Sequence, residues 1–254
     1  MDFEDKVILI TGAAGGIGKE TARAFQNEGA SLVLVDINKN ALEDMVDELG
    51  LKDYLLIPAD VTDENEVKNY INLIIDKYRK IDVFFNNAGI TGKFAEITEV
   101  TSQDFNKVID INLKGAFYGL KYVLQVMNKQ NFGCIINTAS TAGVNGSASL
   151  GPYAATKHAI VGLTKTAAIE GAKRGIRVNA ICPAPVDTEL MNKLDKDKDT
   201  ENPEKARKSY EQKIPLGRYA SPEEIAELVL FLSSSKSSYI TGGAYLIDGG
   251  LSAN

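Results

Sequence analysis

A tyrosine and a lysine four residues apart carry the first chemical signal in the sequence. Tyr153 and Lys157 open an alanine-rich stretch that predicts a helix to about residue 173, and residues four apart lie on one helix face. A phenol normally has a pKa near ~10, and a fixed ammonium beside it favours the phenolate and lowers that pKa. Ser140, which follows a strand-like run over residues 134–138, can donate a hydrogen bond to the oxygen on which the phenol acts. The three side chains together can move a proton to or from an oxygen atom.

The Y-x-x-x-K pattern is common on helix surfaces, so whether it indicates a catalytic site depends on the other motifs in the chain. An apolar run at residues 7–10 leads into the turn T-G-A-A-G-G-I-G at residues 11–18, and then into a helix that runs to Gly29. In such a turn Gly12 permits the tight bend, Gly16 lets backbone N–H groups approach a pyrophosphate, and Gly18 lets the helix pack closely on the strand. The turn predicts a dinucleotide site; an ordinary strand-to-helix connection is the alternative.

Asp36 ends a second apolar run, at residues 31–35, and comes eighteen residues after Gly18. A carboxylate at this point accepts hydrogen bonds from the adenosine ribose hydroxyls of NAD and repels a 2′-phosphate. Ile37 follows it where a cation would favour the phosphate. The sequence therefore predicts NAD as the cofactor, with a turn or cap residue before Asn38 as the structural alternative for Asp36.

Polar residues at three further places suggest contact with a ligand. The sequence N-N-A-G at residues 86–89 follows a strand-like run at 81–85, where amides and small residues suit close approach to a ligand. Asn112 lies in the middle of a helix expected over residues 102–131, a poor position for asparagine unless its amide is used or buried. Asp60 follows a strand expected at 54–58, where it faces a ligand or caps a turn before a helix over residues 64–78.

In this order, the motifs T-G-x-x-x-G-x-G, N-N-A-G, Asn112, Ser140 and Y-x-x-x-K resemble the short-chain dehydrogenase/reductase family over nearly the whole chain. The resemblance implies a catalytic triad of Ser140, Tyr153 and Lys157, completed by Asn112, which in the family marks a helix break and holds a relay water. It also implies cofactor binding by Gly12, Gly15, Gly16, Ile17, Gly18, Asp36, Ile37, Asp60, Val61, Asn87, Ala88, Gly89, Tyr153, Lys157, Pro183, Val186 and Thr188.

The chain departs from the family pattern at residues 182–188, C-P-A-P-V-D-T, where Ala184 stands in place of the usual glycine. The substitution removes easy access to a positive φ in a loop expected to face the cofactor. The charged stretch at about residues 189–214 follows directly and matches the family's substrate-covering lid. A solvated helical surface is the alternative for most of its side chains.

Composition bounds the remaining possibilities. With 254 residues, 44% of them hydrophobic, and no linker or repeat, the chain predicts a single domain over residues 1–254. A net charge of −6 argues against a nucleic-acid partner, and no apolar run is long enough for a bilayer, so we expect a cytoplasmic protein without membrane contact. Cys134 and Cys182 are expected to be buried thiols, and with one histidine we expect no metal site.

The expected fold is α/β: a single-domain Rossmann fold with a doubly wound, mostly parallel sheet of about seven strands and helices on both faces. The expected activity is NAD(H)-dependent interconversion of a secondary alcohol and a ketone, loosely closest to bacterial reductases of cyclic ketones and diketones. The alternatives are a 3-oxoacyl-carrier-protein reductase and a non-catalytic dinucleotide sensor. The family resemblance also implies a homotetramer. The substrate, the direction of reaction and the stereochemistry are not encoded in these motifs.

Overall fold

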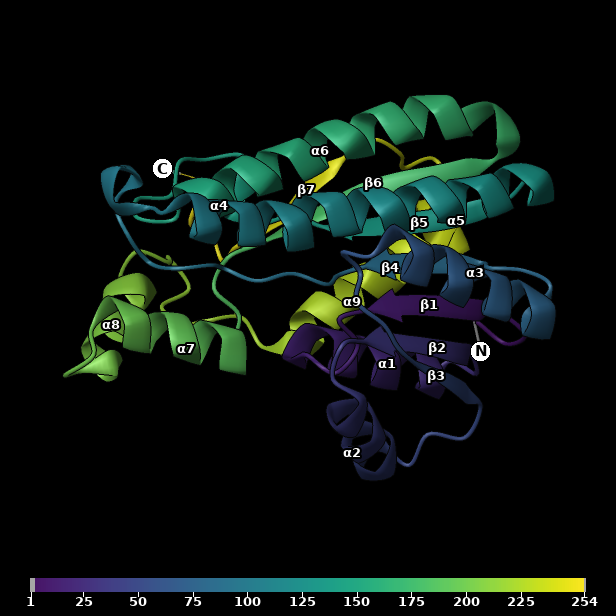
Figure 1. Cartoon of the computed structure of the whole chain (residues 1–254), viewed down its shortest axis with the longest axis horizontal. Coiled ribbons are helices and arrows are strands. Elements are labelled where there is room, and N and C mark those ends of the chain that lie inside the picture. Colours follow the sequence, from purple (N-terminus) through teal and green to yellow (C-terminus); the bar gives the residue numbers. More distant parts are fainter. Residues whose placement is uncertain (1–2, 254) are drawn as a thin grey trace.

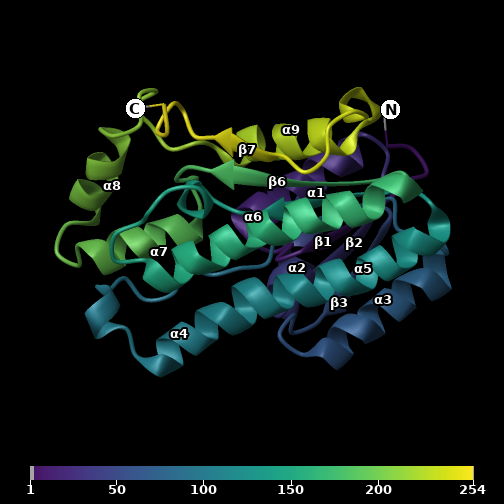
Figure 2. The same cartoon turned by 90° about the horizontal axis from the view of Figure 1, so that it is seen from above.

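Within residues 3–253, seven parallel strands form one twisted sheet with helices on both faces (Figures 1 and 2). The structure, a computed structural model, describes residues 3–253. The strands are β1 (Val7–Thr11), β2 (Ser31–Asp36), β3 (Tyr54–Pro58), β4 (Val83–Asn86), β5 (Gly133–Thr138), β6 (Ile176–Pro183) and β7 (Ala244–Ile247). Their order across the sheet is β3-β2-β1-β4-β5-β6-β7, and every neighbouring pair is parallel. The Rossmann-type prediction is therefore confirmed.

Helices join the strands and cover the sheet. They are α1 (Gly16–Asn27), α2 (Lys39–Leu49), α3 (Glu64–Tyr78), α4 (Ser102–Val108), α5 (Ala116–Gln130), α6 (Gly151–Gly171), α7 (Glu189–Lys198), α8 (Pro203–Glu211) and α9 (Pro222–Ser233). In Figure 2 the helices α1 and α9 lie on one side of the sheet, and α3, α5 and α6 on the other. None of the helices within residues 3–253 is long and apolar enough to cross a membrane.

Alternate residues of the central strands fill two separate cores. On β1, Ile8 and Ile10 pack with Phe25 and Ile225 under α1 and α9, whereas Val7 and Leu9 pack on the opposite face with the residues of α3 and α5. All four side chains of this strand are buried. Burial on both faces explains why β1 is an unbroken apolar run, as parallel strands require.

The order of the strands reverses between β1 and β4. The chain adds β2 and β3 on one side of β1 and then returns to build β4 to β7 on the other. At such a switch point the loops after the strands diverge and leave a crevice at their carboxyl ends. The helices α7 and α8 stand beyond this edge, at the left of Figure 1.

The long helix expected over residues 102–131 is interrupted. Between α4 and α5 the backbone takes a π-helical turn, η2 (Ile109–Gly115), with Asn112 at its centre. One-turn π segments inside α-helices are frequent at functional sites. The break that the family resemblance implied at Asn112 lies within η2.

Candidate active site

A cavity of about 1500 Å³ opens at the carboxyl edge of the sheet, over the switch point between β1 and β4. Its walls include all of the predicted site residues except Gly18 and Asn112. The glycine turn, the loop after β4, Ser140, the start of α6 and the loop after β6 thus meet around one space. Residues almost the whole length of the chain apart come together there, as the spacing of the motifs predicted.

The glycines of the turn are required by close contacts. Gly12 has φ +62°, and a Cβ there would lie 2.9 Å from the Cα of Ala88. A Cβ on Gly18 would overlap the carbonyl oxygen of Gly12, so Gly18 lies beneath the turn and not on the cavity wall. A Cβ on Gly16 would lie 2.7 Å from Cγ2 of Thr188, which shows that the glycine turn and the loop after β6 touch.

Asp36 joins the end of β2 to the glycine turn. Its Oδ2 accepts from the backbone N–H of Ala14 at 3.2 Å and its Oδ1 from that of Asn38 at 3.1 Å. The turn role that was the alternative for Asp36 is therefore present. Each carboxylate oxygen has a second lone pair, and Asp36 lines the cavity, so the same group can still accept from a ligand hydroxyl.

The loops beside the glycine turn are fixed by amides and carboxylates. Asn87 donates from Nδ2 to the carbonyl oxygens of Thr11 and Gly12, both at 3.2 Å, and so holds the turn from the side of β4. Asp60 accepts from the backbone N–H of Thr62 at 2.8 Å, while the cap of α3 is Asp63. Asp60 therefore closes a turn and lines the cavity, and both of its predicted uses are compatible with this position.

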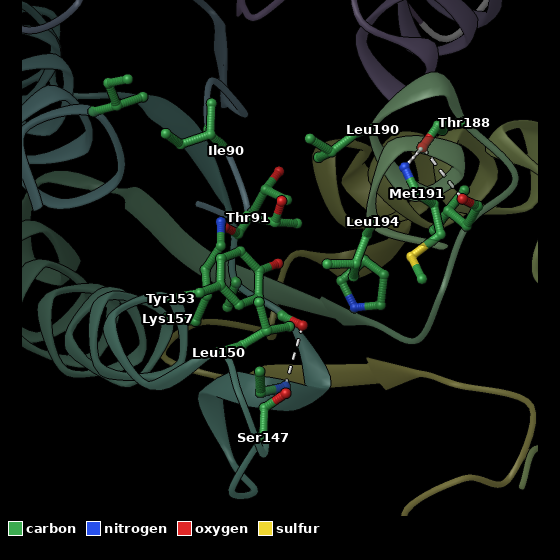
Figure 3. A pocket seen from close by; sticks show the side chains of 18 of the residues that line it. Ile90, Thr91, Ser147, Leu150, Tyr153, Lys157, Thr188, Leu190, Met191 and Leu194 are labelled. Carbon is green, nitrogen blue, oxygen red and sulfur yellow. Dashed lines mark hydrogen bonds between the residues drawn. The ribbon is translucent and has the colours of Figure 1, made fainter. Parts of the chain in front are cut away.

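Lys157 is the most buried charged group of the site. Its side chain is 3% exposed, and Nζ donates to the main-chain carbonyl of Thr138 at 2.7 Å and lies 5.5 Å from the centre of the Tyr153 ring. Burial lowers the pKa of Lys157 to about 8. The shared helix face expected for Tyr153 and Lys157 is confirmed: both side chains reach the cavity from α6 (Figure 3).

The Tyr153 phenol differs from expectation in one respect. Burial raises its pKa above the ordinary value, and the hydrogen bond with the Ser140 hydroxyl offsets only part of that rise. The depressed pKa expected from the neighbouring ammonium was therefore wrong for the protein without ligands, because Lys157 points toward Thr138 and the phenol is poorly hydrated. Tyr153 is thus a neutral proton donor at neutral pH, with Ser140 beside it.

Asn112 is completely buried behind the cavity wall. Its Oδ1 accepts from the N–H of Ile90 and its Nδ2 donates to the carbonyl of Ile90, both at 2.8 Å. Nδ2 also lies 3.3 Å from Oγ1 of Thr156, which in turn donates to the carbonyl of Tyr153 at 2.7 Å. The buried, satisfied amide that was the alternative for Asn112 is therefore found. The side chain connects the loop after β4 with the first turn of α6.

The loop after β6 borders the cavity with no residue of 184–188 at a positive φ. The positive-φ residues of the structure do not include Ala184, whose N–H donates to the carbonyl of Ile247 on β7 at 3.1 Å. Beyond it, Thr188 begins α7: its Oγ1 accepts from the N–H of Met191 at 3.3 Å and donates to the carbonyl of Val186 at 3.2 Å. The alanine is accommodated because this loop does not need the conformation that glycine permits.

The predicted lid is a pair of helices with a buried face. Met191 and Leu194 of α7 are buried in one apolar cluster with Leu150, Ile214 and Tyr219. Figure 3 shows Leu190, Met191 and Leu194 across the hollow from Tyr153 and Ile90. The solvated-surface alternative therefore holds only for the outward faces of α7 and α8.

The motifs did not identify the side chains that form the wall beyond Tyr153. These are mainly apolar: Phe94, Leu150, Leu190, Met191, Leu194, Tyr210 and Leu251. One signal was available in the sequence, because Leu190, Met191 and Leu194 lie at helical spacing inside an otherwise charged stretch. The others come from separate loops that only the fold brings together.

The space above the glycine turn fits a dinucleotide. At Gly12 and Gly16 a side chain would collide with neighbouring atoms, so the turn keeps bare backbone at the start of α1, where helical N–H groups favour a phosphate. Asp36 lies at one part of the wall, and Ser140, Tyr153 and Lys157 lie at another. The site can therefore hold an extended cofactor with its reactive end beside a proton donor.

Comparison with known proteins agrees with this geometry. The sequence model of a family described as enoyl-(acyl carrier protein) reductase matches residues 12–252. Levodione reductase from Leifsonia aquatica is 42% identical, covering 99% of this chain and 96% of that protein. A crystal structure of levodione reductase, 42% identical to this chain, superposes with a TM-score of 0.96 over 99% of both chains. This chain belongs to the short-chain dehydrogenase/reductase family.

Other members of the family differ in their names and in their cofactors. The 3-oxoacyl-[acyl-carrier-protein] reductase FabG of Thermotoga maritima is 43% identical over 99% of each chain. The structure of NAD⁺-bound xylitol dehydrogenase has a TM-score of 0.94 at 37% identity, covering 98% of this chain and all of that one. ElxO with NADP bound has a TM-score of 0.90 at 33% identity, covering 98% of this chain and 99% of that one. Within this family, the present chain is an oxidoreductase of alcohols and ketones.

Proposed function

We propose that this short-chain dehydrogenase/reductase uses NAD(H) to interconvert a cyclic secondary alcohol and its ketone, with Tyr153 as the general acid and base. The observation that carries the proposal is the meeting of Ser140, Tyr153 and the buried Lys157 on one wall of a cavity that also contains the glycine turn and Asp36. The 42% identity to levodione reductase supports a cyclic ketone as the substrate.

In the direction of reduction, the ketone oxygen accepts hydrogen bonds from the Ser140 and Tyr153 hydroxyls. A reduced nicotinamide held in the cavity would supply the hydride for the carbonyl carbon. As negative charge develops on the oxygen, the Tyr153 phenol gives it a proton, and the Lys157 ammonium stabilises the phenolate that remains. The raised pKa of Tyr153 suits this direction, because the phenol holds its proton until the alkoxide needs it. Oxidation of the alcohol follows the same steps in reverse.

Tyr153→Phe tests the mechanism. The variant keeps the ring that packs beside Lys157 but cannot donate a proton, so we expect reduction of cyclohexanone by NADH to fall by at least about 10²-fold. The dissociation constant of NADH, followed by fluorescence, should change little. Tyr239→Phe, at a fully exposed tyrosine, is the matched control. Turnover by Tyr153→Phe at the rate of the unmodified enzyme would rule out the mechanism.

Asp36→Ala tests the cofactor. Removal of the carboxylate should lower kcat/KM with NADH by roughly tenfold or more and raise it with NADPH, because a ribose hydroxyl loses its acceptor and a 2′-phosphate loses a repelling charge. Asp44→Ala on α2, which does not line the cavity, is the control. A preference for NADPH in the unmodified enzyme would contradict the role given to Asp36.

A panel of substrates separates the remaining alternatives. Faster turnover of a 3-oxoacyl thioester than of any cyclic ketone would favour the acyl-carrier-protein reductase, which the 43% identity to FabG supports. Binding of NADH without turnover of any ketone would favour a dinucleotide sensor. A homotetramer is part of the proposal, and light scattering should give four times the chain mass of 27.5 kDa.

A further inference from the structure

Two lysines of the lid face the cavity. The stretch at residues 189–214 carries seven acidic and seven basic side chains, so it is neutral as a whole. Its residues that line the cavity are Leu190, Met191, Leu194, Lys198, Tyr210 and Lys213. Both of the charged groups in that set are cationic, and the other four are apolar or aromatic. The lid therefore borders the cavity with positive charge although it has no net charge.

Neither Lys198 nor Lys213 forms an ion pair within 4.0 Å with any residue in the described range, 3–253. The nearby acids have other partners. Asp187 and Glu211 accept from Arg207, and Asp195 accepts from the Tyr219 hydroxyl at 2.9 Å. The charge of Asp195 is felt by Lys198, but burial and the charge of Lys213 outweigh it and lower the pKa of Lys198. An anion between the two ammonium groups would relieve their repulsion.

Lys198 is held in place by α8, and its ammonium group has further N–H donors for a ligand. Its Nζ donates to Oγ of Ser209 at 2.7 Å and lies 3.8 Å from the centre of the Tyr210 ring. An ammonium group has three N–H donors, and Ser209 takes one of them. Because α8 already fixes the side chain, a ligand that accepts from the other donors need not restrict a flexible lysine on binding.

The lysines adjoin an apolar compartment that leads to the reacting group. Phe94, Leu150, Met191, Leu194, Tyr210 and Leu251 line this part of the cavity and belong to one apolar cluster, against which Tyr153 also packs. The acidic residues on the cavity wall, Asp36, Asp60 and Asp110, belong to other segments: the end of β2, the loop after β3 and the turn η2. Tyr153, these apolar side chains and the two lysines thus border the same cavity.

We propose that the substrate carries an anionic substituent, a carboxylate or a phosphate, on an apolar body, and that Lys198 and Lys213 receive that group. This inference rests on the proposed function, because it names the class of alcohol or ketone taken by the same site. Tyr153 and Ser140 act on the oxygen at one end of the molecule, and the lysines select its other end. A neutral cyclic ketone of the same size fills only the apolar part.

Binding measurements without turnover test this inference. Calorimetry on the protein saturated with NAD compares cyclohexanecarboxylate, cyclohexyl phosphate and the neutral cyclohexanecarboxamide. We expect at least one anion to bind roughly tenfold more tightly than the amide, since hydrogen bonds to charged groups are the stronger ones. The better anion identifies the substituent as carboxylate or phosphate. The preference should weaken as the salt concentration rises.

Lys198→Met and Lys213→Met should each reduce the preference for the anion severalfold and leave the affinity for the amide nearly unchanged. Lys196→Met is the control, at an exposed lysine of α7 that does not line the cavity, and it should keep the preference for the anion. Equal binding of anion and amide by the unmodified protein, or an unchanged preference in both cavity variants, would overturn the inference.

Turnover distinguishes this inference from the function on which it rests. The substrates are 4-oxocyclohexanecarboxylate and the matching amide, each with NADH. Absence of turnover with both would count against the proposed function, while the calorimetric comparison would still decide whether the lysines receive an anion. Turnover of both with equal kcat/KM would support the function and overturn the anionic substituent.

Discussion

Arg207 donates from its two terminal nitrogens to the two carboxylate oxygens of Asp187, at 2.9 and 3.0 Å. This bidentate pair ties α8 to the loop after β6, one residue before Thr188. The same guanidinium bonds Glu211 at 2.9 Å and lies 4.5 Å from the centre of the Tyr219 ring. Paired charges of this planar geometry fix orientation as well as distance. The lid is therefore attached to the loop that borders the cavity.

Arg207→Met should loosen the lid without unfolding the protein. Asp187 and Arg207 are partly exposed, and pairs of this kind contribute at most about 1 kcal/mol to global stability. We expect a change below that value in chemical denaturation but severalfold faster thermolysin cleavage within residues 189–214. Lys205→Met, at an exposed lysine of α8, is the control and should leave the cleavage rate unchanged. Equal cleavage rates in the two variants would mean that the ion pair does not hold the lid.

Lys157 should make stability depend on pH in the alkaline range. Its pKa is about 8 in the folded protein and ~10.4 in an unfolded chain. Between these values the unfolded chain binds the proton that the folded protein has released, so the free energy of unfolding rises with pH. Below about pH 8 the full penalty of the buried charge is present, and above pH ~10.4 it is gone.

The comparison with Lys157→Met isolates this contribution in the protein without cofactor. The free energy of unfolding of the unmodified protein, minus that of the variant, should increase by about 3 kcal/mol between pH 7 and pH ~10.4. Lys165→Met on the same helix, at an exposed position, corrects for the general effect of pH on denaturation. If the difference in the free energy of unfolding does not change with pH, burial does not lower the pKa of Lys157.

The sequence predicted the elements whose signals are local. The strand at Tyr54–Pro58 and the helix at Glu64–Tyr78 agree with prediction to the residue. The motif residues come together at one edge of the sheet because parallel strands end there together.

What could not be predicted depends on contacts between distant segments. The pKa of Tyr153 follows from burial beneath the lid side of the cavity, which the spacing to Lys157 does not describe. The hydroxyl of Thr188, which the family resemblance assigned to cofactor binding, caps α7. The apolar compartment could not be predicted either, because its walls come from separate segments: the loop after β4, Leu150, α7, α8 and Leu251.

Gly18→Ala should distort the glycine turn, because Gly18 packs directly against it. The added methyl group would overlap the Gly12 carbonyl oxygen and lie 2.8 Å from the Cα of Ala13. We expect a loss of about 1–3 kcal/mol in the free energy of unfolding, as in other overpacked sites, and weaker NADH binding because the turn must shift. Gly162→Ala is the control: apart from its chain neighbours and the nearby backbone of its own helix, no atom lies within 4 Å of the added methyl group, so it should stabilise α6 by about 0.5–1 kcal/mol.

Asn112→Ala should separate the connecting role of the amide from a direct role in catalysis. The variant leaves both the N–H and the carbonyl of Ile90 without their partner, and removes the bond to Thr156. Buried groups left unpaired cost about 1–3 kcal/mol each, so a loss of roughly 2–4 kcal/mol in the free energy of unfolding is expected. Because Thr156 also holds the carbonyl of Tyr153, kcat should fall while the dissociation constant of NADH stays nearly constant.

Asn192→Ala on α7, at an exposed position, is the control for both measurements. A variant with full stability but reduced kcat would instead indicate that Asn112 acts on the proton path itself.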